Sequence, residues 1–275
     1  MEYVIVNGEI QKKEEADLSP FLWNLPHLLH QKIWYGFGGI PLFSENLTNI
    51  KQHLLVFGAK IPELFYNERE LFRITKRLLN KNKYFRSGYI NLQLFIQEQK
   101  TNFIITASAF SEFDFPFPEQ GLLLQFSEQR KYSGNLLSQI FSSHQSIWKA
   151  ETTILENNPL WNSIFLNDQD AVCDVISANI FMLRNKILFT PSLKTGCSND
   201  ILRNIILKIS EQLHFQIQES DNIHKEDCFQ MNEVFIASEQ TGFQWVLGID
   251  NKRFVRQNSL VIHQELNEFL KSKVN

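Results

Sequence analysis

The residues best suited to chemistry lie in one stretch of the chain, from Lys149 to Arg203. Lys149 follows the apolar pair Ile147-Trp148 and carries an amine that could act as a nucleophile or a proton carrier. Beyond it come an acid, an amide and two short motifs, namely Asp174, Asn179, Thr190-Pro191 and Gly196-Cys197-Ser198-Asn199-Asp200. Taken singly, each has a simpler interpretation, because a lone lysine is usually solvated and a Ser, Asn or Asp before a helix is usually its N-cap.

Other kinds of site have little support in the sequence. The motifs GxGxxG, GxxxxGK[ST], GxSxG and HExxH are absent, so no nucleotide-binding or hydrolase motif is present. Cys173, Cys197 and Cys228 form no CxxC pair, which argues against a zinc site or a disulfide framework and favours a reducing, cytoplasmic compartment. His27 and His30 form an HxxH pair, but no further ligand accompanies them, so no metal site is predicted.

The composition is that of a globular protein, with 43% hydrophobic and 21% charged residues in a chain of 275. A net charge of -3, with Lys and Arg spread along the chain, gives no electrostatic footprint for nucleic acid or an anionic membrane. Apolar runs stay below the roughly 18 residues of a membrane span, and the first residues lack a signal-peptide pattern. Neither nucleic acid nor a membrane is therefore expected as a partner.

Strand and helix patterns mix in both halves, which predicts an α/β or α+β fold. Tyr3 to Val6 is a β-branched run, and Asn7-Gly8 after it predicts a tight hairpin turn. Helical spacing covers 46–57, 68–80, 134–143, 201–213 and 260–272. Strand patterns cover 32–43 around a Gly38-Gly39 turn, 89–95, 102–107, 121–126, 163–166, 170–175, 180–183, 187–190, 232–238 and 243–249. Two prolines within 113–118 mark a linker, so we predict domains at 1–115 and 116–275.

The order of these motifs resembles the class IV family of enzymes that use pyridoxal 5'-phosphate (PLP). This family includes branched-chain and D-amino-acid aminotransferases and 4-amino-4-deoxychorismate lyase. The resemblance rests on Lys149, Asp174, Asn179-Ile180-Phe181, Thr190-Pro191, Gly196 to Arg203, Asn232 to Ile236, Gly242 to Val246, Asn7-Gly8 and Gly39 to Leu47. It covers most of the chain, densely after Lys149 and thinly before, and it implies a homodimer. The implied fold is D-amino-acid-aminotransferase-like, with a small N-terminal α/β domain and a larger C-terminal pseudobarrel domain.

The resemblance also implies a role for each residue of the site. Lys149 would form the Schiff base with PLP and carry the α-proton. Asp174, where the family has a glutamate, would keep the pyridine nitrogen protonated by charge pairing. Asn179 would have a structural role in its loop. Ile201 and Leu202 would offer backbone N–H groups to the phosphate at a helix N-terminus.

Several positions depart from the family pattern, chiefly around the phosphate. The family's His-x-x-Arg pair in the first helix reads Asn46 and Asn49, its helix-start glycine reads Asp200, and a small residue of the phosphate site reads Glu239. A cation is lost and up to two anions are gained near a dianion, each like-charge contact costing on the order of 1–4 kcal/mol. The tyrosine expected after the lysine reads Thr153, and the interval from Lys149 to Asp174 is short for the family.

Three functions stay open on this basis. The first is a 4-amino-4-deoxychorismate lyase, which releases 4-aminobenzoate and pyruvate for folate synthesis. The second is an amino-acid aminotransferase of the branched-chain or D-amino-acid type. The third is a non-catalytic homologue that has lost PLP, for which an acidic or blocked phosphate site would be the signature.

Overall fold

The computed structural model describes residues 2–17, 27–97 and 100–274, and the chain divides into two compact units. The first unit is Met1–Phe115 with Leu270–Asn275, and the second is Pro116–Phe269. The division falls inside the predicted 113–118 linker, but residues 270–275 group with the first unit. The ion pair between Lys273 Nζ and Glu45 Oε1, at 2.8 Å, is one contact that ties this C-terminal segment to it.

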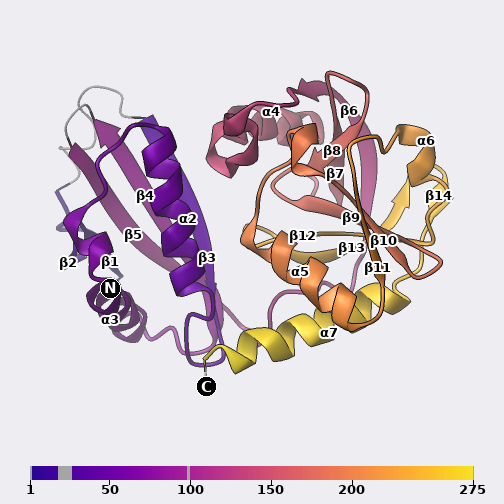
Figure 1. The fold of residues 1–275 in the computed structure, drawn as a ribbon. Coiled ribbons are helices and arrows are strands. Elements are labelled where there is room, and N and C mark those ends of the chain that lie inside the picture. The colour runs from indigo at the N-terminus through magenta and orange to yellow at the C-terminus, as the bar shows by residue number, and fades with distance from the viewer. Residues whose placement is uncertain (1, 18–26, 98–99, 275) are drawn as a thin grey trace. The chain divides into compact units, whose positions relative to one another are not determined.

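The described residues of the first unit form a five-stranded antiparallel sheet in the order β2-β1-β5-β4-β3 (Figure 1). Its strands are β1 (Tyr3–Val6), β2 (Glu9–Lys12), β3 (His27–Tyr35), β4 (Ser87–Gln97) and β5 (Lys100–Phe110). Asn7 and Gly8 join β1 to β2 with φ values of 48° and 99°, so the predicted hairpin turn is confirmed. Both residue types tolerate the left-handed backbone that this turn requires.

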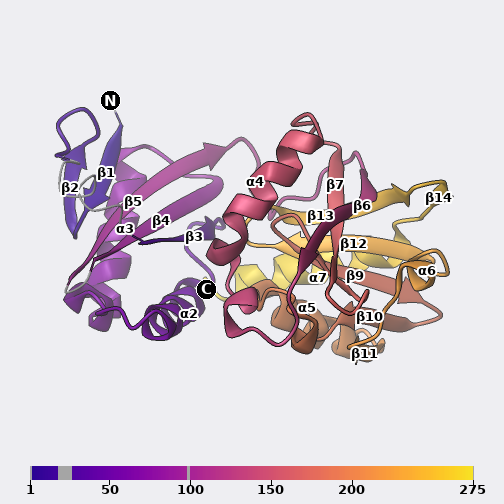
Figure 2. The ribbon, with the colours of Figure 1, turned by 90° about the horizontal axis from the view of Figure 1, so that it is seen from above.

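Helices α2 (Phe43–Val56) and α3 (Glu68–Lys81) pack on this sheet, with the short 3₁₀ helix η1 (Glu63–Tyr66) between them in sequence (Figure 2). Apolar side chains of both helices meet one sheet face, where Phe43, Leu47, Ile50 and Leu71 lie against Ile33, Ile90, Leu92 and Ile105. The predicted short strand at the end of 32–43 is wrong. Its last residues instead lead directly into α2, whose N-cap is Leu42, because Pro41 lacks the N–H that a ladder needs.

The second unit contains a nine-stranded sheet within the described part of the chain, in the order β11-β10-β9-β12-β13-β6-β7-β8 with β14 paired to β13. The strands are β6 (Leu122–Lys131), β7 (Trp161–Asn167), β8 (Val172–Val175), β9 (Asn179–Arg184), β10 (Ile187–Pro191), β11 (Gln216–Ser220), β12 (Glu233–Ser238), β13 (Gly242–Ile249) and β14 (Lys252–Arg253). A bridge between Val175 and Ala178 joins the end of β8 to the start of β9. The sheet therefore curls back on itself.

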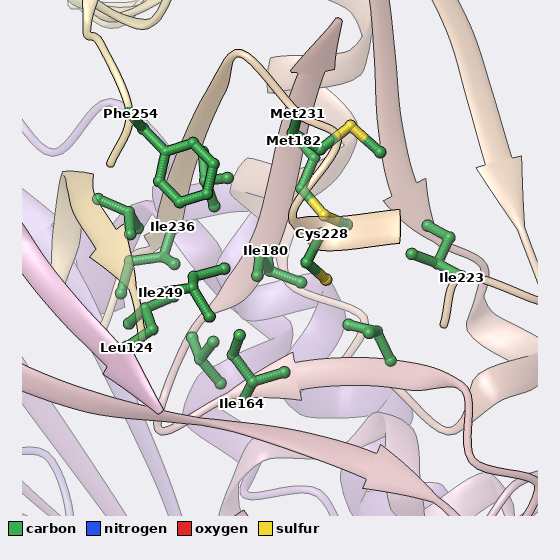
Figure 3. Packing of buried hydrophobic residues seen from close by; sticks show 14 of the residues in the cluster. Leu124, Ile164, Ile180, Met182, Ile223, Cys228, Met231, Ile236, Ile249 and Phe254 are labelled. Atoms are coloured by element: carbon green, nitrogen blue, oxygen red, sulfur yellow. The ribbon is translucent and has the colours of Figure 1, made fainter. Parts of the chain in front are cut away.

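The interior of this curled sheet is the main core of the second unit. Ile180, Met182 and Ile236 point into it together with Leu124, Ile164, Ile249 and Phe254 (Figure 3). Because strand side chains alternate, the neighbouring residues Phe181 and Phe235 face the other side. There Phe235 stacks between Phe181 and Phe243, at centroid distances of 4.9 and 4.5 Å.

The helices of the second unit are α4 (Gln145–Ile154), α5 (Ile201–Gln212), α6 (Lys225–Cys228) and α7 (Gln257–Ser272), with the 3₁₀ helices η2 (Leu136–Gln139), η3 (Phe141–His144) and η4 (Leu193–Thr195). The predicted helix at 134–143 is wrong, because η2 and η3 occupy this segment. The strand predicted to end at Phe126 continues as β6 to Lys131. Both differences lie beside the candidate site.

Candidate functional site

Lys131 is the last residue of β6, and its amine is the centre of the candidate site. Strand β6 pairs with β7 in parallel, and an irregularity in the register lies between Phe126 and Arg130. Such an irregularity re-aims the side chains that follow it. The Lys131 side chain is only 1% exposed, whereas Arg130 beside it is half-exposed. The structure therefore buries a lysine that sits in a polar sequence, Ser127 to Lys131.

The Nζ of Lys131 lies 2.7 Å from Oδ2 of Asp174 on β8. Both side chains are removed from water, which would favour their neutral forms if each were alone. Burial acts to lower the pKa of Lys131, but the charge of Asp174 and the neighbouring Cys173 outweigh it, so this pKa is raised. The amine is therefore held as a cation against the Asp174 carboxylate. Breaking one half of such a pair leaves an uncompensated buried charge.

The loop before α5 completes the surroundings of Asp174. The backbone N–H and the hydroxyl of Ser198 donate to Oδ2 of Asp174 at 3.2 and 3.1 Å. The other carboxylate oxygen, Oδ1, is buried without a hydrogen-bond partner. Asn179 Nδ2 donates to the Ser198 carbonyl at 2.7 Å, so it fixes the loop that holds Asp174. Asn179 thus makes a structural contact within this loop.

The structure does not bring Lys149 to this cluster. Lys149 lies on α4 with an exposed side chain, whereas its neighbour Trp148 is buried on the other face of the helix. Its carbonyl accepts from the Thr153 hydroxyl at 3.0 Å, an ordinary contact within the helix. The placement of Lys149 beside Asp174 is therefore wrong, and the amine at that position belongs to Lys131. Local sequence could not reveal this, because a short polar run after a strand usually indicates a surface turn.

The N-terminus of α5 also differs from the prediction. Asp200 is its N-cap and accepts the Leu202 N–H at Oδ1, at 2.8 Å. The Glu239 backbone N–H also donates to it. Burial raises the pKa of Asp200 to about 7, although these N–H donors act to lower it. The Leu202 N–H, predicted to be free for a phosphate together with that of Ile201, is thus already bonded to a carboxylate.

Two further polar residues from the predicted motifs are structural. Arg203, on the first turn of α5, is buried and donates to the Pro191 carbonyl at 2.8 Å and to Glu219 at 2.6 Å. Asn46, on α2, accepts from Gln31 Nε2 at 2.7 Å and donates to the Leu42 carbonyl at 2.9 Å. Within each unit these side chains hold neighbouring segments together.

Metal and membrane sites are not found in the described part of the chain. No group of three or more His, Cys, Asp or Glu side chains there could hold a metal ion. The side chain of His27 lies outside the described residues, and burial lowers the pKa of His30. None of the described helices combines the length and apolar character that crossing a bilayer requires.

Comparisons with known proteins identify the family. Residues 37–249 match the model of the amino-transferase class IV family, so the chain belongs to that family. A probable branched-chain-amino-acid aminotransferase of Aquifex aeolicus is 24% identical over 98% of this chain and 91% of its own. A relative of the same name from Rickettsia bellii is 25% identical over 79% of this chain and 77% of its own.

Solved structures confirm the fold. The branched-chain amino acid aminotransferase of Escherichia coli superposes with a TM-score of 0.83 at 16% identity, covering 99% of this chain and 95% of that one. The Thermobaculum terrenum enzyme, determined in its PLP form, gives 0.82 at 15% identity, covering 99% and 94%. The expected class IV aminotransferase fold is therefore confirmed, with the curled sheet as its larger part.

The site fits one end of PLP and not the other. Lys131 supplies an amine, and Asp174 supplies a buried acceptor that a protonated ring nitrogen would satisfy. A bound ring would replace the direct contact between the two side chains, because its aldehyde and its nitrogen lie at opposite ends of the ring. At the phosphate end, the expected helix donor at Leu202 is taken by Asp200. Among the described residues, no cationic side chain acts on the protonation of that carboxylate.

Proposed function

We propose that this chain is a PLP-dependent amino-acid aminotransferase in which Lys131 is the reactive lysine and Asp174 is its charge partner. The observation that carries the proposal is the buried contact of 2.7 Å between these residues in a chain of the class IV family. Residues with perturbed protonation and a specific charge partner are frequent at functional sites. The proposal thus assigns the reactive amine to Lys131 and not to Lys149, the candidate from the sequence.

When bound, PLP supplies an aldehyde for an amine and a ring that withdraws electrons from the substrate. Lys131 would bind the aldehyde through Nζ and would carry the α-proton of the substrate. Asp174 would hold a proton on the ring nitrogen, with Ser198 and Asn179 fixing its orientation. Burial keeps water away from both groups, which strengthens their electrostatic interaction.

The substrate class follows from the relatives. Two of the similar chains are named as probable branched-chain-amino-acid aminotransferases, and this favours an amino acid with a 2-oxo acid as acceptor. Comparisons give 4-amino-4-deoxychorismate lyase no support. A homodimer and a cytoplasmic location remain part of the proposal.

A non-catalytic homologue is the second candidate, and one observation favours it. Buried Asp200 occupies the N-terminus of α5 with a carboxylate, as expected of a protein that has lost the phosphate site for PLP. In that case the Lys131–Asp174 pair would serve stability alone. The two candidates differ in whether an aldehyde reaches Lys131.

Titration of the purified chain with PLP separates these candidates. The enzyme should develop a visible absorption band that borohydride bleaches, and mass spectrometry should locate the reduced adduct on Lys131. Lys149→Ala is the matched control and should leave the band unchanged, whereas Lys131→Arg, which keeps the cation beside Asp174, should abolish it. A wild-type protein that stays colourless with saturating PLP and with saturating pyridoxal would defeat the enzyme proposal. If the band appears, incubation with branched-chain amino acids plus 2-oxoglutarate, and separately with aminodeoxychorismate, distinguishes transaminase from lyase.

A further inference from the structure

The N-terminus of α5 already holds an anionic group that belongs to this chain. Asp200 is 4% exposed, and its carboxylate accepts the Leu202 N–H at 2.8 Å and the Glu239 N–H. Free N–H groups at the start of a helix are a common binding site for phosphate, because they point outward and carry partial positive charge. Here that property is used by the side chain one residue before the helix.

Among the described residues, no cation forms an ion pair with Asp200. Arg203 lies on the same helix turn, but its Nη2 donates to the Pro191 carbonyl and to Glu219, and its Nε is buried without a hydrogen-bond partner. Burial raises the pKa of Asp200, and two backbone N–H donors act to lower it. No cation in the described part of the chain contributes to this shift. The side chain of Glu239, whose backbone donates to Asp200, is itself buried. A phosphate placed here would therefore compete with the Asp200 carboxylate for space and for the Leu202 N–H.

We infer that Asp200 stands in for a phosphate, so that this chain accepts a pyridoxal-type aldehyde at Lys131 without anchoring a phosphate at α5. The inference rests on the proposed role of Lys131 and concerns the ligand of that amine: an aromatic aldehyde with no dianionic substituent is bound at least as well as PLP. Pyridoxal belongs to this class. PLP carries a phosphate, which the Asp200 carboxylate would repel and whose helix donor it already occupies.

Reductive trapping tests the ligand class directly. The full-length chain is incubated with pyridoxal or PLP over a concentration series, reduced with borohydride, and the adduct on Lys131 is quantified by mass spectrometry. Condensation of the amine with the aldehyde releases one water, and borohydride supplies the hydride that fixes the product as a secondary amine. Wild type should trap pyridoxal at least as well as PLP. Above pH 7, where Asp200 is charged, Asp200→Gly frees the Leu202 and Glu239 donors and should raise the preference for PLP by roughly 100-fold, because a buried like charge is removed.

A second measurement does not depend on Lys131. Inorganic phosphate, compared with chloride at equal ionic strength, should raise the melting temperature of Asp200→Gly and leave wild type unchanged. Asp200→Asn keeps the volume and the cap without the charge, so its response should be smaller than that of Asp200→Gly. Asn67→Gly removes the N-cap of α3, which bonds the Glu70 N–H at 3.2 Å, and controls for cap loss elsewhere.

The outcomes separate the two proposals. Strong preference of wild type for PLP over pyridoxal, or equal stabilisation of wild type and Asp200→Gly by phosphate, overturns the role of Asp200. Absence of any Lys131 adduct with either aldehyde, in wild type and in Asp200→Gly, overturns the proposed enzyme function. Phosphate stabilisation confined to Asp200→Gly would then still support the occupied anion position.

Discussion

Replacing Asp200 with asparagine should stabilise the protein at neutral and alkaline pH, although the change touches a helix cap. Asparagine caps helices as well as aspartate does, so the bond to the Leu202 N–H is retained. What changes is the cost of keeping a buried charge. Burial raises the pKa of Asp200 from its ordinary 3.8 to about 7. The folded chain therefore binds a proton between these values that the unfolded chain has released.

The sign and size of the effect follow from this difference. Because the folded state binds more protons, the wild-type free energy of unfolding falls as the pH rises from 4 to 7. A shift of about three units corresponds to about 4 kcal/mol, reached above pH 7 and absent below pH 4. Asp200→Asn lacks this loss, so its stability advantage should grow over the same interval and then stay constant.

Urea unfolding of both proteins at a series of pH values measures this advantage. Hydrogen exchange in α5 reports whether the second unit is the part that responds. Asp114→Asn, at an exposed carboxylate, should show no comparable trend. A difference between Asp200→Asn and wild type that does not change between pH 4 and 8 would refute the assignment of a buried, costly carboxylate at this position.

Three further changes test the packing. Lys131→Met should cost about 3–5 kcal/mol in urea unfolding because it strands the Asp174 charge, and Asp174→Leu added to it should recover most of the loss. A single variant as stable as wild type would contradict the buried pair. Glu233→Ala should cost about 3 kcal/mol in the same assay, since Glu233 accepts backbone and side-chain bonds in the first turn of α7, and Glu233→Gln should cost less. Gly88→Ala should lower the melting temperature far more than Gly58→Ala, because its new methyl would lie 2.0 Å from a backbone oxygen of β5. At Gly58 the methyl meets open space, and only the strain of its left-handed backbone, with φ +63°, is added. Similar melting temperatures for these two variants would show that β4 and β5 can separate to admit the methyl group.

Local patterns predicted much of the fold. The helical periodicity at 68–80 and 201–213 corresponds to α3 and α5 within one residue. An amphipathic helix can be predicted from its own sequence because its buried apolar residues recur every three to four positions. Asn7-Gly8 predicted its turn because few residues adopt that backbone. The fold class followed from the order of motifs, and the match of residues 37–249 to the class IV family confirms it.

Predictions failed where burial depends on strand pairing. The strand predicted to end at Phe126 continues through a polar run, because pairing with β7 extends β6 to Lys131. The segment after Gly134 has helical spacing, but it folds as two 3₁₀ turns. Such outcomes depend on partners distant in the chain, which no local window contains.

The sequence alone determined which residues carry charge and the family to which their order belongs. It also singled out Asp174 and Asn179, which the structure links through contacts with Ser198. Only the tertiary structure decided which amine meets Asp174, because Lys149 and Lys131 are chemically identical and differ only in how their surroundings exclude water. The same is true of Asp200, whose type is plain in the sequence but whose burial at a helix end is set by the packing around α5.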